Sequence, residues 1–344
     1  MAKITGPRAG KLYHGVFPGG DGGKEADVSR KSLEDYERAA GRKVAWVYFS
    51  HEWIIKDKDN QKIDNSKFPL EMVNWIHSYG AAPFIRLMLR SSDTQFIPEP
   101  YYTLQAILDG KFDAKLTSWG KAAGDRGIPL ICEFGTEVNG RWFPWNAVHN
   151  GGPKGPELFR KAYRHIIDSI RAAGGTQITW VYHVNHGSDP NTFIEGHPCC
   201  DWNAIEAYDP GKDYADWIGL SIYGSQRPGE NDGPVFSARM EKLRDPLSKL
   251  AQGRPIMICE FAYAEQKDHP KFVKDWVQDA LAYLLPKESG KVPFISGFSW
   301  WNEAWKDEGT EIEMRLQKLP DEVKQIFRER LQSDRVIDRP MQMN

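Results

Sequence analysis

Residues 128–145 read Ile-Pro-Leu-Ile-Cys-Glu-Phe-Gly-Thr-Glu-Val-Asn-Gly-Arg-Trp-Phe-Pro-Trp. The stretch begins with a short apolar run, 128–132, which is typical of a fully buried strand. Glu133 and Glu137 follow this run, and a carboxylate at the end of a buried strand is costly unless it is paired or used. The stretch therefore predicts a buried strand that carries acidic side chains to its carboxyl end.

Aromatic side chains follow these two carboxylates closely. Trp142, Phe143 and Trp145 come within eight residues of Glu137. Flat apolar rings suit stacking on sugar rings, and a carboxyl group can donate a proton at a glycosidic bond. The combination is typical of a site that cleaves sugars. The alternative is a structural strand whose glutamate is ion-paired and whose aromatics only fill the core.

Composition is that of an ordinary globular protein of 344 residues, with 40% hydrophobic and 27% charged residues. The net charge of -2 indicates no basic surface for nucleic acid or for an anionic membrane. No apolar run approaches about 18 residues, so we expect no membrane span. The 13 Trp, 13 Tyr and 16 Phe are a surplus that suits carbohydrate stacking.

The chain has four cysteines, and their spacing matches neither a C-x-x-C pair nor a zinc site: Cys132, Cys199, Cys200 and Cys259. No pair of histidines on a helix face and no cluster of carboxylates suggests a catalytic metal, so we expect no metal, and we expect no cofactor. The first residues lack the charged-then-apolar pattern of a signal peptide. We expect a secreted protein whose signal peptide is not part of this chain, and a cytoplasmic protein is the alternative.

Eight strand-like runs recur along the chain: Leu12–Phe17, Val44–Phe49, Ala82–Leu89, Ile128–Cys132, Ile178–Val184, Trp217–Tyr223, Pro255–Cys259 and Phe294–Trp300. A helical pattern is expected after each strand, and the clearest is the apolar stripe of residues 159–170. Such alternation predicts an α/β fold, a (β/α)8 TIM barrel in a single domain. We place an extension at 1–11, the barrel at 12–332 and a tail at 333–344. A doubly wound sheet is the alternative, but no Gly-x-Gly-x-x-Gly turn follows the first strand.

In a TIM barrel the active site lies at the carboxyl ends of the strands. The residues at these ends are polar or aromatic: His51, Trp53, Arg90, Glu137, Asn139, Asn185, His186, Tyr223, Glu260, Trp301 and Asn302. Glu137 and Glu260 belong to strands that can face each other across one opening. Because glycoside hydrolysis requires two carboxylates about the scissile bond, this pair is our candidate for catalysis.

Three stretches resemble glycoside hydrolase family 26, the β-mannanases and their relatives among the retaining (β/α)8 glycosidases. Glu137-Val-Asn-Gly-Arg-Trp-Phe-Pro-Trp145 is similar to the family's E-x-N-G-x-W-F-x-W motif. Residues 207–223 are similar to the family's segment before the sixth strand, and Pro255-Ile-Met-Ile-Cys-Glu260 to its nucleophile strand. The matches keep the family's order, and the resemblance spans most of residues 12–305.

The resemblance implies that Glu137 is the general acid/base, that Glu260 is the nucleophile, and that hydrolysis proceeds with retention. It implies that Tyr223 hydrogen-bonds the nucleophile and that Trp142 and Trp301 line sugar subsites, while Glu133 and Glu265 are structural. We also expect substrate contacts from the remaining candidates at the strand ends: His51, Trp53, Asn139, His186 and Asn302.

The chain departs from the family pattern at Thr136, where members usually have His before the acid/base. The expected function is an endo-β-1,4-mannanase that acts as a monomer on a polysaccharide. A mixed-linkage β-1,3-1,4-glucanase or a β-xylanase of the same family is the first alternative. The second is a carbohydrate-binding barrel without catalysis. A lyase or aldolase would need a lysine or a metal cluster at a strand end, and none is convincing.

Overall fold

The computed structural model describes residues 2–19, 28–56, 59–189, 201–229, 235–287 and 294–339. Within them, eight parallel strands form the barrel: β1 (Leu12–Phe17), β2 (Trp46–Glu52), β5 (Ala82–Met88), β6 (Leu130–Phe134), β7 (Ile178–Asn185), β8 (Trp217–Ser221), β9 (Ile256–Phe261) and β10 (Gly297–Trp301). Each pairs with the next in this order, and β10 pairs with β1 to close the barrel. The predicted TIM barrel in a single α/β domain is confirmed.

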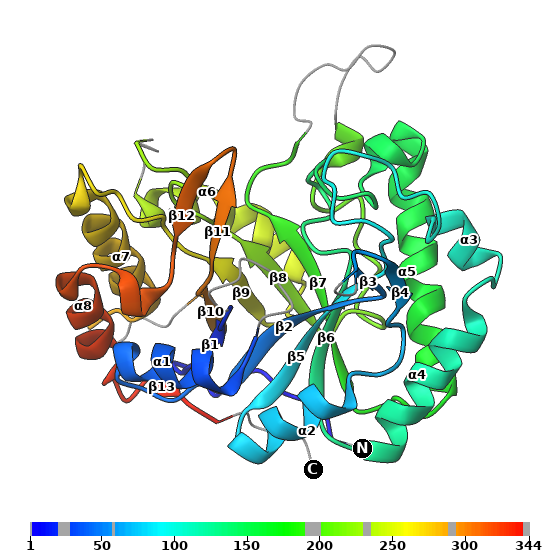
Figure 1. Ribbon diagram of the computed structural model, residues 1–344, viewed down its shortest axis with the longest axis horizontal. Coiled ribbons are helices and arrows are strands. Elements are labelled where there is room, and N and C mark those ends of the chain that lie inside the picture. The colour runs from blue at the N-terminus through cyan, green and yellow to red at the C-terminus, as the bar shows by residue number, and fades with distance from the viewer. Residues whose placement is uncertain are drawn as a thin grey trace.

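Helices surround the barrel (Figure 1). They are α1 (Arg30–Ala40), α2 (Leu70–Tyr79), α3 (Leu104–Leu108), α4 (Asp113–Arg126), α5 (Gly155–Ala172), α6 (Phe236–Ala251), α7 (Pro270–Leu284) and α8 (Asp321–Leu331). Short 3-10 helices are η1 (Ala147–His149), η2 (Gly152–Lys154), η3 (Asp201–Asn203) and η4 (Leu316–Lys318). None of the described helices is long and apolar enough to cross a bilayer.

The described residues of the fifth unit depart from the expected alternation of strand and helix. Between β7 and β8 the described residues form only η3, turns and coil. Residues 201–216 contain four aspartates and a Pro-Gly pair, which favour turns over helix. The third unit, by contrast, carries α3 in addition to the expected α4.

The two ends of the described chain add to the barrel. Val336–Ile337 forms β13, which pairs in parallel with Leu12 and Tyr13 at the start of β1. Residues 333–344, which we expected to be a tail, thus include a strand. In the expected extension, the buried Ile4 donates its backbone N–H to Thr179 Oγ1 at 2.8 Å.

Two hairpins complete the described strands. One consists of β3 (Ile54–Lys56) and β4 (Lys62–Asp64), and the other of β11 (Ala304–Asp307) and β12 (Thr310–Glu313). The β11–β12 hairpin directly follows β10 and projects beyond the barrel at the top of Figure 1. The β11–β12 hairpin and loops at the carboxyl ends of the strands form the walls of a cleft.

Near the amino ends of the strands, Trp46 fills the barrel interior. Its ring is fully buried, contacts Tyr13 at a centroid distance of 5.4 Å, and donates from Nε1 to Ser299 Oγ at 2.7 Å. A Cβ atom at Gly15 would lie 2.0 Å from Trp46 Nε1, so only glycine fits beside the ring. This end of the barrel is closed by packing.

Candidate active site

A cleft of about 1320 Å³ lies at the carboxyl ends of the strands. Small-molecule pockets usually enclose roughly 300–1,000 Å³, so this cleft has room for a longer ligand. Six of the predicted site residues line it: Glu137, Trp142, His186, Tyr223, Glu260 and Trp301. The structure therefore brings the two candidate carboxylates and three aromatic candidates into one cleft.

Glu137 lies in the turn that follows β6, where its φ of 48° is in the left-handed region. A residue other than glycine rarely adopts this conformation, and such strain is concentrated at functional sites. Both carboxylate oxygens accept hydrogen bonds, from Trp142 Nε1 at 2.6 Å and from Asn185 Nδ2 at 2.9 Å. A Cβ atom at Gly140 would lie 2.2 Å from the Trp142 ring, so this glycine lets the indole fold back toward Glu137.

Glu260 stands near the end of β9 and is almost completely buried. Tyr223 donates its hydroxyl to Oε2 at 2.9 Å, and Arg86 Nε lies 3.7 Å from Oε1. Burial raises the pKa of Glu260 to about 7, and the charge of Glu137 adds to the increase while Arg86 and His183 oppose it. Ionisation of this carboxyl therefore depends on nearby cations.

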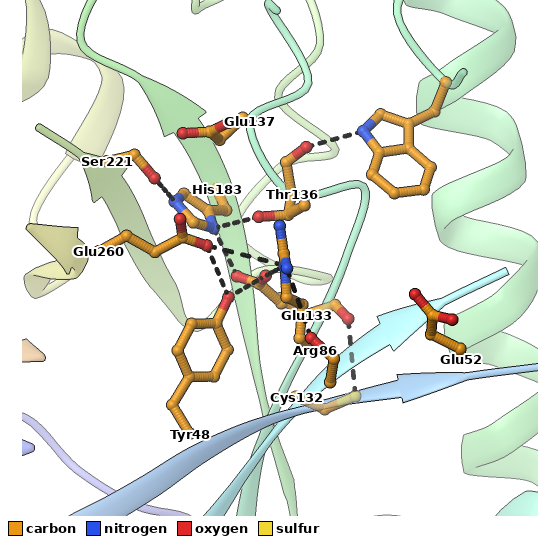
Figure 2. A network of polar contacts seen from close by, with 12 residues as sticks. Tyr48, Glu52, Arg86, Cys132, Glu133, Thr136, Glu137, His183, Ser221 and Glu260 are labelled. Carbon is orange, nitrogen blue, oxygen red and sulfur yellow. Dashed lines mark hydrogen bonds and ion pairs between the residues drawn. The ribbon is translucent and has the colours of Figure 1, made fainter. Parts of the chain in front are cut away.

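A buried polar network lies beside Glu260 (Figure 2). Glu133, fully buried in β6, accepts from the Tyr48 hydroxyl at 2.5 Å and lies 2.7 Å from His183 Nδ1. Burial alone would raise the pKa of Glu133, but His183, Tyr48 and Arg86 together hold it below its usual value. Glu133 is thus an ion-paired carboxylate inside the barrel.

His183 links this network to Thr136. The imidazole comes from β7; its Nδ1 lies 2.9 Å from Thr136 Oγ1 and its Nε2 lies 2.8 Å from Ser221 Oγ. At the position where the chain departs from the family pattern, a threonine hydroxyl therefore meets a histidine from the neighbouring strand. We missed His183 because it lies inside a strand. The available signal was a titratable side chain within an apolar run.

Other cleft residues were also missed from sequence. Arg86 lies inside β5, and its guanidinium is 5.3 Å from the Phe143 ring and 5.4 Å from the Trp301 ring. Phe96 has an exposed fraction of 56% and a φ of 62°, and its backbone N–H donates to Trp142 O at 3.1 Å. A strained and exposed aromatic at the edge of a cleft is a candidate for ligand contact.

Two candidates at the end of β2, His51 and Trp53, do not line the cleft. His51 is buried, its Nε2 lies 3.0 Å from Asn65 O, and burial lowers its pKa to about 4. Trp53 is fully buried with its ring 5.5 Å from that of Tyr102. The strand extends to Glu52, beyond the expected Phe49, so these side chains pack under the loops instead of standing at the opening.

Two asparagine candidates, Asn139 and Asn302, do not line the cleft and accept hydrogen bonds from the backbone instead. Asn139 accepts from the Asn185 backbone N–H at 2.7 Å and thereby positions the residue that hydrogen-bonds Glu137. Asn302 accepts from the Leu316 backbone N–H at 2.7 Å. Both are fully buried, so the structure gives them roles in shaping loops.

Among the described residues, Glu133, His183 and Cys259 offer potential metal-ligand atoms within 4.8 Å of one another. Glu133 and His183 are bonded directly to each other at 2.7 Å, which is the geometry of a hydrogen-bonded ion pair rather than of ligands around an ion. Cys132 and Cys259 are buried free thiols. Cys199 and Cys200 lie outside the described residues.

Comparison with known proteins agrees with this geometry. The model of Glycosyl hydrolase family 26 matches residues 98–248. Endoglucanase H of Acetivibrio thermocellus is 28% identical over 250 residues, which cover 69% of this chain and 26% of that protein. Beta-1,3-xylanase TXYA of a Vibrio species is 22% identical over 256 residues, covering 68% of this chain and 50% of that protein. The chain thus spans half or less of the length of these relatives.

A solved structure shows the same fold: the family 26 β-mannanase from Bacteroides ovatus superposes with a TM-score of 0.62 at 16% identity, covering 95% of this chain and 90% of that chain. The barrel with paired glutamates at its carboxyl end defines a TIM-barrel glycosidase class. Within that class, the chain is similar to glycoside hydrolase family 26, a retaining family whose model matches residues 98–248.

Proposed function

We propose that this protein is a retaining endo-β-glycanase, with Glu137 as general acid/base and Glu260 as nucleophile. The observation that carries the proposal is the placement of both carboxylates in one long cleft, each held by its own hydrogen bonds. Two such carboxylates are what retaining hydrolysis requires.

In the first step a Glu260 oxygen attacks the anomeric carbon while the bond from that carbon to the glycosidic oxygen breaks. Glu137 gives its proton to the departing oxygen, and an ester between the sugar and Glu260 remains. In the second step water attacks the same carbon and gives a proton to Glu137. Glu260 leaves as a carboxylate, and the product keeps its original configuration.

Aromatic rings supply the platforms for a polymer. Trp301 is stacked on Phe17 with a centroid distance of 3.8 Å, which fixes its ring in the cleft wall. Trp142 hydrogen-bonds Glu137, and Phe96, whose backbone N–H donates to Trp142 O, adds a further ring to the cleft lining. A cleft of about 1320 Å³ favours internal cleavage of a chain over removal of single terminal sugars.

Two glycans are candidates for the substrate. The motif around Glu137 favours β-1,4-mannan. The 28% identity to a protein named endoglucanase favours β-glucan as the second candidate. Thr136 and its partner His183 lie close to both carboxylates and are the place where the chain departs from the mannanase pattern.

The test is release of reducing sugar from glucomannan, galactomannan, barley mixed-linkage glucan, carboxymethylcellulose and xylan. Release from mannans alone would identify a mannanase, and release from barley glucan alone a glucanase. Glu260→Ala should be inactive while remaining folded, and Glu265→Gln is the matched control because Glu265 lies outside the cleft lining. Binding without release of reducing ends would instead support a carbohydrate-binding barrel.

A further inference from the structure

Five ionisable side chains are buried together at the floor of the cleft: Arg86, Glu133, Glu137, His183 and Glu260. They come from β5, β6, the turn after β6, β7 and β9. An isolated charge in a protein interior is strongly unfavourable, so such groups adopt protonation states that balance one another. The question is which states let Glu260 ionise.

Arg86 is shared between two carboxylates. Its Nε lies 3.7 Å from Glu260 Oε1 and 4.0 Å from Glu133 Oε1. One guanidinium therefore faces both the proposed nucleophile and the buried structural glutamate. If Arg86 were the sole cation among the five, one of these two carboxyls would have to hold a proton.

His183 is placed to be the second cation. Its Nδ1 lies 2.7 Å from Glu133 Oε2, and its Nε2 lies 2.8 Å from Ser221 Oγ, so both ring nitrogens face an acceptor (Figure 2). Burial lowers the pKa of His183, but the Glu133 charge and hydrogen bond outweigh burial, and the net pKa is raised. The imidazolium form therefore fits both its contacts and its surroundings.

Several other titratable groups face this cluster, but they carry no charge at neutral pH. Burial raises the pKa well above its ordinary value for all four of them: Tyr48, Cys132, Tyr223 and Cys259. The balance is therefore set by three carboxyls and two bases. With Glu137 protonated and Glu260 ionised, as the first chemical step requires, two anions face two cations.

We propose that His183 is a positioning residue that acts as the second buried cation and thereby allows Glu260 to ionise. The inference rests on the proposed function, because it assigns the ionised state to the nucleophile. His183 contacts no substrate in this scheme. It acts through Glu133: because His183 balances the charge of Glu133, the Arg86 guanidinium can balance the charge of Glu260.

The test is the pH dependence of kcat/KM in His183→Gln, Glu133→Gln and the double variant, on the best glycan of the panel. His183→Gln removes the cation and should shift the acidic limb of the profile to higher pH by about one unit or more. Removing Glu133 alone should leave the limb in place or move it downward. The double variant replaces a buried ion pair by two neutral amides, so its limb should return near that of the wild type.

A uniform loss of kcat at every pH in His183→Gln, with the acidic limb unmoved, would overturn the inference. A double variant at least as impaired as His183→Gln would also overturn it, because a merely structural role predicts that the losses of the two single variants add up. If His183→Gln fails to fold, Glu133→Gln still tests the direction in which the acidic limb moves. The double variant still tests whether the limb returns near that of the wild type.

A measurement without substrate separates this inference from the proposed function. In ¹⁵N-labelled wild-type protein at about pH 7, both ring nitrogens of His183 should carry protons. The double variant assigns the signal by its disappearance. A neutral ring overturns the inference alone, whereas failure to cleave any glycan overturns the proposed function.

Discussion

The two ends of the barrel interior are built from the same strands, and both are buried, yet their chemistry is opposite. At the amino end, β2 places Trp46 and β6 places Leu130, which are both fully buried. At the carboxyl end, β6 places Glu133, β7 places His183 and β9 places Glu260. The same hydrogen-bonded frame therefore serves packing at one end and charge at the other.

This contrast separates stability from function. Burial of apolar surface contributes roughly 25 cal/mol per Å², so the amino end stabilises the fold. Taking charges out of water is unfavourable, and even a well-paired buried ion pair adds little net stability. Changes at the carboxyl end should therefore affect activity, and changes at the amino end should affect the free energy of unfolding.

The largest effect is expected from Glu260→Gln. Loss of the nucleophile should lower kcat by about 10⁴-fold or more, while the variant keeps a cooperative melting transition. Initial rates and calorimetry on the same preparation measure both quantities. If the variant were destabilised but kept its kcat per folded molecule, the carboxyl end of the barrel would serve stability instead of activity, contrary to its assignment to activity.

Trp46→Ala should give the opposite result. It removes the ring that fills the amino end and should lower the free energy of unfolding by about 3–5 kcal/mol, with kcat per folded molecule unchanged. Urea unfolding followed by circular dichroism measures the loss. Trp46→Phe, which keeps an aromatic ring, is the control and should lose less. If Trp46→Ala kept the wild-type free energy of unfolding, the contrast between the two ends of the barrel would be contradicted.

The stability of the carboxyl end should also depend on pH. Because the folded-state pKa of Glu260 is raised to about 7, this group favours the folded state at low pH, and that contribution is lost as pH rises through about 7. Glu260→Gln lacks this dependence. The melting temperature of the variant minus that of the wild type should therefore grow between about pH 5 and about pH 8, by roughly 2–4 °C for each kcal/mol.

A constant difference between these two melting temperatures across the same range would mean that burial does not raise the Glu260 pKa. Using the difference is essential. His14 and His51, whose pKa values burial lowers to about 4, make stability rise with pH, opposite in sign to the Glu260 contribution and by the same amount in the wild type and the variant. That contribution cancels in the subtraction.

The smallest effect is expected at the edge of the cleft. Phe96→Ala should raise KM for a polysaccharide by about threefold to tenfold and leave kcat unchanged, since a stacking platform is worth roughly 1 kcal/mol. Tyr101→Ala is the matched control, because Tyr101 is equally exposed at 55% but does not line the cleft. Equal KM values for both variants would remove Phe96 from the binding surface.

Much of the fold could be predicted from the sequence because strands and helices carry local patterns. Glu137 and Glu260 could be placed in one cleft because both stand just beyond apolar runs. His51 and Trp53 could not be placed correctly, because β2 continues to Glu52 and the burial of its last residues depends on loops packed above them. Boundaries of this kind are set by tertiary contacts.

The charged network was the part that local pattern did not reveal. Tyr48, Arg86 and His183 lie in the middle of strands, and each acquires its role from partners on other strands. Glu133 was expected to be structural, and its ion pair with His183 agrees with that expectation. The convergence of β2, β5, β6, β7 and β9 on one point is a property of barrel closure, which the chain does not show locally.

The most direct test of the proposed catalytic pair is to trap the glycosyl-enzyme. A 2-deoxy-2-fluoro glycosyl fluoride, built on the sugar that the preferred glycan contains, slows the second step so that the ester accumulates. Mass spectrometry of the intact protein and of its peptides should show one added fluorosugar on Glu260. Active enzyme that forms no adduct, or that carries the sugar on another residue, would contradict the assignment of Glu260 as nucleophile.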